Sequence, residues 1–216
     1  MNRKMYASCL MLLSLGMNAE EIETDSLRTV ELDDVNIMST RATKTTPVAF
    51  TNISGEQIEK VNFGQDLPYL LSMTPSAITT SDAGGGIGYT TLRVRGVDAT
   101  RINVTMNGVP MNDAETHSVY WYDTPDVASS VGTIQLQRGV GTSTNGTGAF
   151  GGSLNMTSAT LPTEFKGTAS LSYGSFNTSK QAIGISSGLL GKHWAIDARL
   201  SRITSDGYVD RAFSDM

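Results

Sequence analysis

Apolar and polar side chains alternate, residue by residue, in several short stretches of this 216-residue chain. The clearest stretches cover residues 92–96, 102–106, 134–138 and 154–156. Because successive side chains of an extended strand point to opposite faces, a period of two predicts strands that are buried on one side. The 22 glycines and the 17% of charged residues favour short strands and tight turns over a helical bundle. The pattern predicts an all-β or β-rich α+β chain.

Two short helices are predicted ahead of the first of these strands. Ser54 precedes Gln57 by three residues, which is the spacing of a capping box at a helix N-terminus. Asp66 is a natural N-cap for a second helix, and Pro68 is tolerated in the first turn of that helix. We expect Pro75 to end it, because proline breaks a helix interior.

Tight turns separate the predicted strands. The pair Asn107-Gly108 is a strong signal for a two-residue hairpin turn. Glycines are concentrated between residues 83 and 89, which indicates a flexible loop. The helices and strands together predict one compact α+β domain over residues 48–160, which is within the usual size of a single domain.

Longer alternating stretches begin after Pro162. Residues 165–173 and 193–201 each alternate over nine residues, and residues 181–190 do so less regularly. Transmembrane β-strands have about 9 to 11 residues with this alternation of apolar and polar side chains. An amphipathic sheet in a water-soluble protein alternates in the same way, so the spacing alone leaves both interpretations open.

The N-terminus has the parts of a secretory signal peptide. Arg3 and Lys4 precede an uncharged apolar run from Met5 to Met17, and Ala19 offers a cleavage site. The run is shorter than the roughly 20 residues that a membrane-spanning helix needs. We therefore predict a signal peptide at residues 1–19, and export of the mature chain.

The segment that follows, residues 20–47, is polar, acidic at its start and rich in threonine at its end. It contains one β-prone island, Val35–Met38. Such a composition predicts a mobile tail that carries a short extended segment.

Residue content excludes several classes of function. Cys9 is the single cysteine and is removed with the signal peptide, so the mature chain has no disulfide and no thiol nucleophile. A net charge of −5 gives no basic surface for nucleic acid. Residues 146–151 spell G-x-G-x-x-G, but a predicted strand follows, so no helix N-terminus is available for a dinucleotide. His117 and His193 lie in different predicted units. We predict a protein that is not an enzyme and has neither a cofactor nor a metal site of its own.

Three segments, taken together, resemble the plug domain of TonB-dependent receptors. Residues 66–76 (DLPYLLSMTPS) are similar to the family's short helix ending in a Pro-Ser pair. Residues 92–113 resemble its arginine-bearing strand and the strand that ends in an Asn-Gly turn. Residues 131–155 resemble its Arg-Gly strand, glycine-rich loop and following strand. In this order and spacing the segments cover most of residues 48–160, and the chain is identified as a member of this family.

The resemblance implies an α+β plug domain, with a small mixed sheet and short helices, followed by the first antiparallel strands of a transmembrane β-barrel. Residues 163–216 would supply these strands. A complete barrel of this kind has about 22 strands. Because the chain offers only about three, we expect it to be the N-terminal portion of a longer transporter in the bacterial outer membrane.

The implied function is active import of a scarce ligand, such as a ferric siderophore, haem or cobalamin. The implied partners are the small-molecule ligand, outer-membrane lipid, and TonB with its inner-membrane energising complex. An extended peptide can bind a partner by adding a strand to the partner's sheet. The family keeps its TonB box where this chain has Leu32, Asp33, Asp34, Val35, Asn36, Ile37 and Met38.

Four arginines are candidates for a latch between plug and barrel, because guanidinium groups pair well with carboxylates on a barrel wall. They are Arg93, Arg95, Arg101 and Arg138. Without the resemblance, they would be read as solvated strand faces.

Ligand contacts are expected from plug loops rich in aromatic and titratable groups, which suit a metal chelate or a ring system. The candidates are Gly85, Tyr89, Glu115, His117, Tyr120 and Trp121. The alternative role for the aromatic run Tyr120, Trp121 and Tyr122 is to anchor its loop against the barrel.

Two other functions stay open at this stage. One branch of the family imports glycans and usually carries an extra β-sandwich domain before the box. Only about a dozen residues separate Ala19 from Leu32, too few for such a domain, which favours an iron chelate or cobalamin as cargo. The second alternative is a secreted β-rich binding or adhesion module that transports nothing.

Overall fold

The structure is a computed structural model that describes residues 41–141, 148–191 and 193–216. All of these residues belong to one compact unit. The predicted signal peptide at residues 1–19 and the predicted TonB box at residues 32–38 lie outside the described residues.

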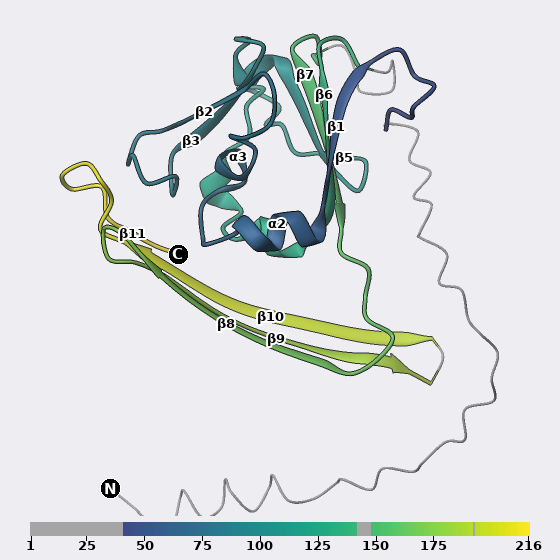
Figure 1. Cartoon of the computed structure of the whole chain (residues 1–216), viewed down its shortest axis with the longest axis vertical. Coiled ribbons are helices and arrows are strands. Elements are labelled where there is room, and N and C mark those ends of the chain that lie inside the picture. The colour runs from purple at the N-terminus through teal and green to yellow at the C-terminus, as the bar shows by residue number, and fades with distance from the viewer. Residues whose placement is uncertain (1–40, 142–147, 192) are drawn as a thin grey trace, which may run out of the picture. The chain divides into compact units, whose positions relative to one another are not determined.

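A five-stranded mixed sheet, which we call the central sheet, is the larger sheet of the α+β part (Figure 1). Its pairs are antiparallel, except that β4 and β7 run parallel. The predicted strands at 102–106, 134–138 and 154–156 all lie in this sheet. In spatial order its strands are β1 (Ala49–Ser54), β6 (Val131–Arg138), β7 (Gly152–Ser158), β4 (Ile102–Met106) and β5 (Val109–Pro110).

The first helix, α2 (Gly55–Val61), begins directly after β1 with the predicted capping box. The Gln57 amide N–H donates to Ser54 Oγ at 3.4 Å, and the Ser54 amide N–H donates to Gln57 Oε1 at 2.9 Å. Each bond satisfies a backbone donor that the first turn leaves free. Ile58 is buried on the inner face of this helix.

The second helix, α3 (Leu67–Leu70), departs from the prediction in two details. It ends at Leu70, so Pro75 lies beyond the helix and does not terminate it. Asp66 occupies the N-cap position, but its side chain does not cap the helix. Instead, the Thr90 hydroxyl donates to Asp66 Oδ2 at 2.9 Å.

Strands β2 (Ala77–Ser81) and β3 (Thr90–Val94) form a separate antiparallel pair. Asn107 and Gly108 have φ of 52° and 83° between β4 and β5, which is the left-handed turn that this pair predicts. The described residues also form the 3₁₀ helices η1 (Ala99–Arg101), η2 (Trp121–Asp123) and η3 (Val127–Ser130). The fully buried side chains of the apolar core include Leu67, Leu71, Val94, Ile134, Leu136 and Leu154.

A second, four-stranded antiparallel sheet follows, which we call the long sheet (Figure 1). The stretch with the weaker alternation, residues 181–190, lies in its longest strand, of 13 residues. Its strands are β8 (Lys166–Gly174), β9 (Thr178–Leu190), β10 (Trp194–Ser205) and β11 (Ser214–Asp215). Among the described residues, no helix is long and apolar enough to span a membrane.

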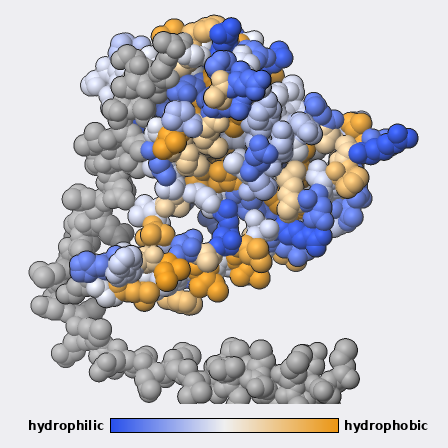
Figure 2. Space-filling model, turned by 180° about the vertical axis from the view of Figure 1, so that it is seen from behind, coloured by the Kyte–Doolittle hydropathy of each residue, from blue (hydrophilic) through white to orange (hydrophobic). Residues whose placement is uncertain are grey.

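The two faces of the long sheet differ in polarity. Along β9, Ile183 and Ile185 are exposed, whereas Lys180 and Ser186 are buried on the other face. Figure 2 shows hydrophobic side chains gathered along the exposed face, which also carries Leu171, Trp194 and Leu200. The sheet therefore has the alternation of a barrel strand, apolar outside and polar inside.

Candidate functional site

A cavity of ≈ 180 Å³ lies beside β3 and β4. It brings together three residues that the sequence predicts as ligand contacts, namely Tyr89, Tyr120 and Trp121. Apolar side chains make up most of its floor, and Asp82 is its one charged lining residue among those that the structure describes. The lining residues are Asp82, Tyr89, Thr90, Thr91, Leu92, Ala99, Ile102, Val104, Ser118, Val119, Tyr120, Trp121 and Tyr122.

Three tyrosines form one side of this cavity. The rings of Tyr89 and Tyr122 lie 4.7 Å apart between centroids, and those of Tyr120 and Tyr122 lie 5.6 Å apart, both tilted. These distances suit favourable aromatic contacts. Tyr122 joins the other two, although the sequence suggests only an anchoring role for it. Desolvation raises the pKa of Tyr122, and the charge of Asp123 adds to this, so its phenol is a proton donor at neutral pH.

Trp121 serves a different purpose from its two neighbours. It is 4% exposed and belongs to the apolar core, so it lines the cavity on the side of the core. Tyr89, by contrast, is 65% exposed. A ligand entering the cavity would therefore meet the tyrosine rings first.

The loop before η2 is ordered by Asp113. Its Oδ1 accepts hydrogen bonds from the Glu115 amide at 3.0 Å and from the Thr116 amide at 2.7 Å. The bonds from Thr116 hold the pKa of Asp113 below its usual value. The Tyr120 hydroxyl in turn donates to Thr116 Oγ1 at 3.1 Å, which ties the tyrosine to this loop.

Three of the predicted ligand residues do not line the cavity. Glu115 and His117 are exposed on the same loop, and His117 has a left-handed φ of 58°. Gly85 lies in the β2–β3 loop with open space where a Cβ would be. These three stay predictions without support from the cavity.

The β2–β3 loop contacts two tyrosine rings from other parts of the chain. A Cβ on Gly86 would lie 2.7 Å from the ring of Tyr69, and one on Gly84 would lie 2.9 Å from Tyr208. The Tyr208 amide also donates to the Ala83 carbonyl at 2.9 Å. Because Tyr208 belongs to the β10–β11 loop, this end of the long sheet meets the α+β part at the glycine loop.

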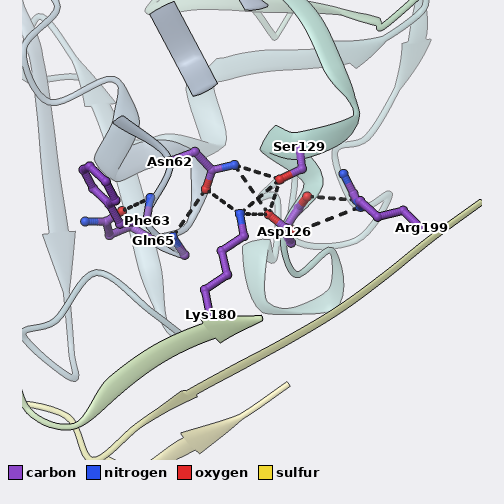
Figure 3. Close-up of polar contacts among 8 residues, drawn as sticks. Asn62, Phe63, Gln65, Asp126, Ser129, Lys180 and Arg199 are labelled. Atoms are coloured by element: carbon purple, nitrogen blue, oxygen red, sulfur yellow. Dashed lines mark hydrogen bonds and ion pairs between the residues drawn. The ribbon is translucent and has the colours of Figure 1, made fainter. Parts of the chain in front are cut away.

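A buried ion pair joins the long sheet to the α+β part (Figure 3). Lys180 Nζ of β9 lies 2.6 Å from Asp126 Oδ1, with the two side chains only 5% and 1% exposed. The ammonium also donates to Asn62 Oδ1 and Ser129 Oγ, both at 3.1 Å. All three ammonium protons therefore have acceptors.

Arg199 of β10 approaches the same aspartate from the other side (Figure 3). Its Nε lies 3.8 Å from Asp126 Oδ2, and its Nη2 donates to the Asp126 carbonyl at 3.1 Å. Burial would raise the pKa of Asp126, but the bonds from Lys180 and Ser129, and the two cationic charges, outweigh it and lower the pKa. Asp126 is therefore ionised at neutral pH and holds two cations of the long sheet.

The four candidate latch arginines lie elsewhere. Arg138 Nη1 donates to Thr51 Oγ1 at 2.7 Å, and Arg101 lies 5.7 Å from the ring centre of Phe150. Arg93 and Arg95 are exposed on the β3 side, and Arg93 forms a 3.8 Å ion pair with Asp98. In the part of the chain that the structure describes, none of the four pairs with a carboxylate of the long sheet, so their latch role stays a prediction.

We call the ion pairs of Asp126 with Lys180 and Arg199 the Asp126 latch. Its carboxylate lies on the α+β part and its cations on the long sheet, which is the reverse of the predicted arginine latch. Nothing in the local sequence marks it, because Asp126 and Lys180 are 54 positions apart. One signal was accessible: Lys180 is a charged residue at an inward position of an alternating strand.

Within the described ranges, no three His, Cys, Asp or Glu side chains gather in a way that would hold a metal ion.

Comparisons with known proteins agree with this architecture. A family model described as the TonB-dependent Receptor Plug Domain matches residues 42–153. No curated protein sequence matches the chain. The ferripyoverdine receptor of the Pseudomonas aeruginosa outer membrane is similar in structure, with a TM-score of 0.58 and 15% identity over 74% of this chain and 20% of its own.

Two further solved structures are similar to the same extent. The siderophore receptor PirA from Acinetobacter baumannii has a TM-score of 0.54 and 20% identity, covering 73% of this chain and 24% of its own. The copper transporter OprC has a TM-score of 0.57 and 17% identity, covering 77% and 25%. The chain thus spans about a fifth to a quarter of the length of the solved proteins that it resembles. At these identities the likeness shows a shared fold.

Proposed function

Because this chain belongs to the TonB-dependent receptor plug family and is an outer-membrane protein, we propose that it is the plug and first barrel strands of an active importer. The cargo would be a scarce small molecule, and TonB would supply force from the inner membrane. The similar solved structures include a ferripyoverdine receptor and a copper transporter, so one fold serves different cargoes.

The polarity of the long sheet is the observation that carries this proposal. Its exposed face is apolar, as a surface in contact with lipid must be. Its other face presents Lys180 and Arg199 to the plug residue Asp126. A secreted, water-soluble module would rarely expose such an apolar face to water, so the polarity of the sheet favours an importer over that alternative.

Loop lengths support an orientation in the membrane. Outer-membrane barrels have short periplasmic turns and longer extracellular loops. The longest connection within the described part of the long sheet is the β10–β11 loop, residues 206–213, and the shorter β8–β9 turn lies at the same end. We therefore place Tyr208, and the β2–β3 loop that contacts it, on the extracellular side.

The cavity with Tyr89, Tyr120 and Tyr122 is the ligand site that we propose. At ≈ 180 Å³ the cavity is smaller than the roughly 300 to 1,000 Å³ of a complete ligand pocket, so its apolar lining and tyrosine side would hold one ring or edge of a ferric siderophore, haem or cobalamin. The tyrosine rings can stack on the ligand, and the hydroxyls of Tyr89 and Tyr122 can donate hydrogen bonds to its oxygens.

Coupling would pass through the segment Leu32–Met38, which we propose as the TonB box. TonB would pair with it as an added strand and pull. The arginines Arg93, Arg95, Arg101 and Arg138 would pair with carboxylates on further barrel strands. The ion pairs of Asp126 with Lys180 and Arg199 would hold the plug to the first barrel strands.

Deletion of residues 31–39 in the full-length gene tests the coupling. Cells would be offered a ferric catecholate, a ferric hydroxamate, haem and cobalamin in turn, with binding measured in de-energised cells and uptake in energised cells. We expect binding to persist and uptake to be lost. Undiminished uptake by the deletion variant would refute TonB coupling through this segment.

A further inference from the structure

Arg41 fastens the start of the described chain to the central sheet. Its Nη2 donates to the Thr133 carbonyl of β6 at 3.1 Å and to the Asn155 carbonyl of β7 at 3.2 Å. The same nitrogen donates to Thr157 Oγ1 at 2.6 Å. One side chain therefore bridges two neighbouring strands of the sheet.

The next residue, Ala42, is held by a side-chain amide. The Ala42 amide N–H donates to Gln135 Oε1 at 2.7 Å, and Gln135 Nε2 donates to the Ala42 carbonyl at 2.9 Å. This is the bonding that a neighbouring strand would provide, supplied here by one glutamine. Ala42 is 5% exposed and Gln135 is 2% exposed, so the contact is buried.

Among the described residues, the acceptors of the Arg41 guanidinium are neutral. In the described residues, no carboxylate forms an ion pair with Arg41, and its buried Nε has no partner. Burial lowers the pKa of Arg41 accordingly. Hydrogen bonds from a charged donor are shorter and stronger when the acceptor is ionised. The attachment at Arg41 is thus weaker than the charged latch at Asp126.

The chain beyond this attachment leads into an edge strand. Residues 43–48 form a turn, in which the Thr43 amide donates to Thr46 Oγ1 at 3.0 Å. Among the described strands, β1 then pairs only with β6, at one edge of the central sheet. Of the contacts that the structure describes, a force applied before residue 41 would load those of Arg41 and Ala42 first, and would reach β1 at Ala49 only after they break.

We propose that Arg41 and Ala42 form a releasable clip, which holds the chain against the polar face of the central sheet and is the first contact to open under a pull from the N-terminal side. The inference rests on the proposed coupling through residues 32–38. Opening of the clip uncovers Gln135 and the Thr133 and Asn155 carbonyls. The load then passes to the β1–β6 pairing, at the end where Ala49 faces Arg138.

Pulling on single molecules of the full-length receptor in a lipid bilayer tests the order of events. With the tip attached at the mature N-terminus, the first rupture should free residues 41–48, which lengthens the chain by about 25 to 30 Å. In the variant Arg41→Gln we expect this first event to lose at least half of its rupture force. Lys44→Gln removes the same charge from an exposed position in the same segment and should leave the event unchanged. An identical first event in Arg41→Gln and wild type would overturn the proposal.

Thiol labelling in cells tests the same clip without altering its hydrogen bonds. Ala42→Cys places a thiol beneath the clip, and Ala128→Cys places one in the apolar core at a similar exposure, 3% against 5%. In a background otherwise free of cysteine, a maleimide should label position 42 at least tenfold faster in energised cells than after addition of a protonophore. Position 128 should stay protected.

The outcomes separate the clip from the proposed function. If uptake needs residues 31–39 but position 42 labels equally with and without energy, the clip proposal fails and TonB coupling stands. If position 128 labels as fast as position 42, the plug opens as a whole and no clip opens first. If uptake does not need residues 31–39, the proposed function itself fails.

Discussion

The central sheet and the long sheet share the alternation of apolar and polar side chains, but they bury opposite faces. In the central sheet, Ile134 and Leu136 are fully buried in the plug core. In the long sheet, Leu171 and Leu200 are each 78% exposed, and the buried residues include the polar Lys180 and Ser186. The central sheet buries its apolar face within the domain, whereas the long sheet exposes its apolar face, as a strand in contact with lipid does. Which face is buried, more than the period of the alternation, distinguishes a plug strand from a barrel strand.

A buried ion pair joins the long sheet to the α+β part, and the largest effect is expected there. Lys180→Met in the full-length receptor would leave Asp126 buried without its nearest cation, which costs about 3 to 5 kcal/mol. Denaturant unfolding of the receptor in micelles would measure it. Lys166→Met, on an exposed lysine of β8, is the matched control.

A double-mutant cycle sharpens this prediction. Because Asp126→Asn removes the charge that Lys180 balances, adding it to Lys180→Met should recover most of the lost stability. Equal stability of the Lys180→Met and Lys166→Met receptors would show that the pair does not hold the two sheets together.

Truncation of leucines compares the two apolar faces directly. Leu136→Ala leaves a cavity in the plug core and should cost about 2 to 5 kcal/mol. Leu200→Ala, on the exposed face, leaves no cavity and should cost less than about 1 kcal/mol. The same denaturant unfolding reports both. Similar losses for the two variants would contradict the opposite burial of the two sheets.

Acidity should affect the plug through Asp66. Desolvation raises the pKa of this carboxyl to about 6, although bonds from Thr90 and the Gly88 backbone oppose the rise. The folded state therefore holds a proton that the unfolded state, with a pKa of about 3.9, has released. The stability that Asp66 contributes is therefore full below pH 4, falls as the pH rises to about 6, and is lost above that, with a total change of at most about 3 kcal/mol.

Asp66→Asn should remove this slope and stabilise the plug at pH 7.5. Hydrogen exchange of plug amides at several pH values would show both effects. A slope that survives the substitution would assign the proton to another group.

The smallest effect on stability is expected at Arg93. Its ion pair with Asp98 is 3.8 Å long and both side chains are more than half exposed, so Arg93→Gln should cost less than about 1 kcal/mol. If Arg93 is a latch to further barrel strands, the same variant should nevertheless alter energised uptake. Unchanged uptake together with unchanged stability would show that Arg93 is a solvent-exposed residue of its strand and not a latch.

Most of the plug strands could be predicted because their alternation is local. Residues 102–106 and 134–138 carry the period of two in full, and Asn107-Gly108 marks its own turn. β1 and β2 are not predictable in this way, since the segments AFTNIS and AITTS contain few apolar side chains. The parallel pairing of β4 with β7 also has no local signal, because it joins residues about fifty positions apart.

The candidate site was predictable in part for the same reason. The run Tyr120, Trp121 and Tyr122 is visible in the sequence, but only the fold shows that Trp121 faces the core and that Tyr89 joins the other rings. Asp126 owes its role to a left-handed φ of 52° and to two cations from distant strands. Alternation alone identifies neither feature.

Fluorescence quenching by brominated lipids tests the contrast between the two sheets most directly. Trp194 of the long sheet is 75% exposed, and Trp121 of the plug is 4% exposed. In the full-length receptor reconstituted in a bilayer, each contribution is obtained by subtracting the spectrum of a Trp194→Phe or Trp121→Phe variant. We expect brominated lipid to quench the Trp194 emission strongly and to leave the Trp121 emission unchanged. Equal quenching of Trp194 and Trp121, or no quenching of Trp194, would contradict the claim that the long sheet contacts lipid and the plug does not.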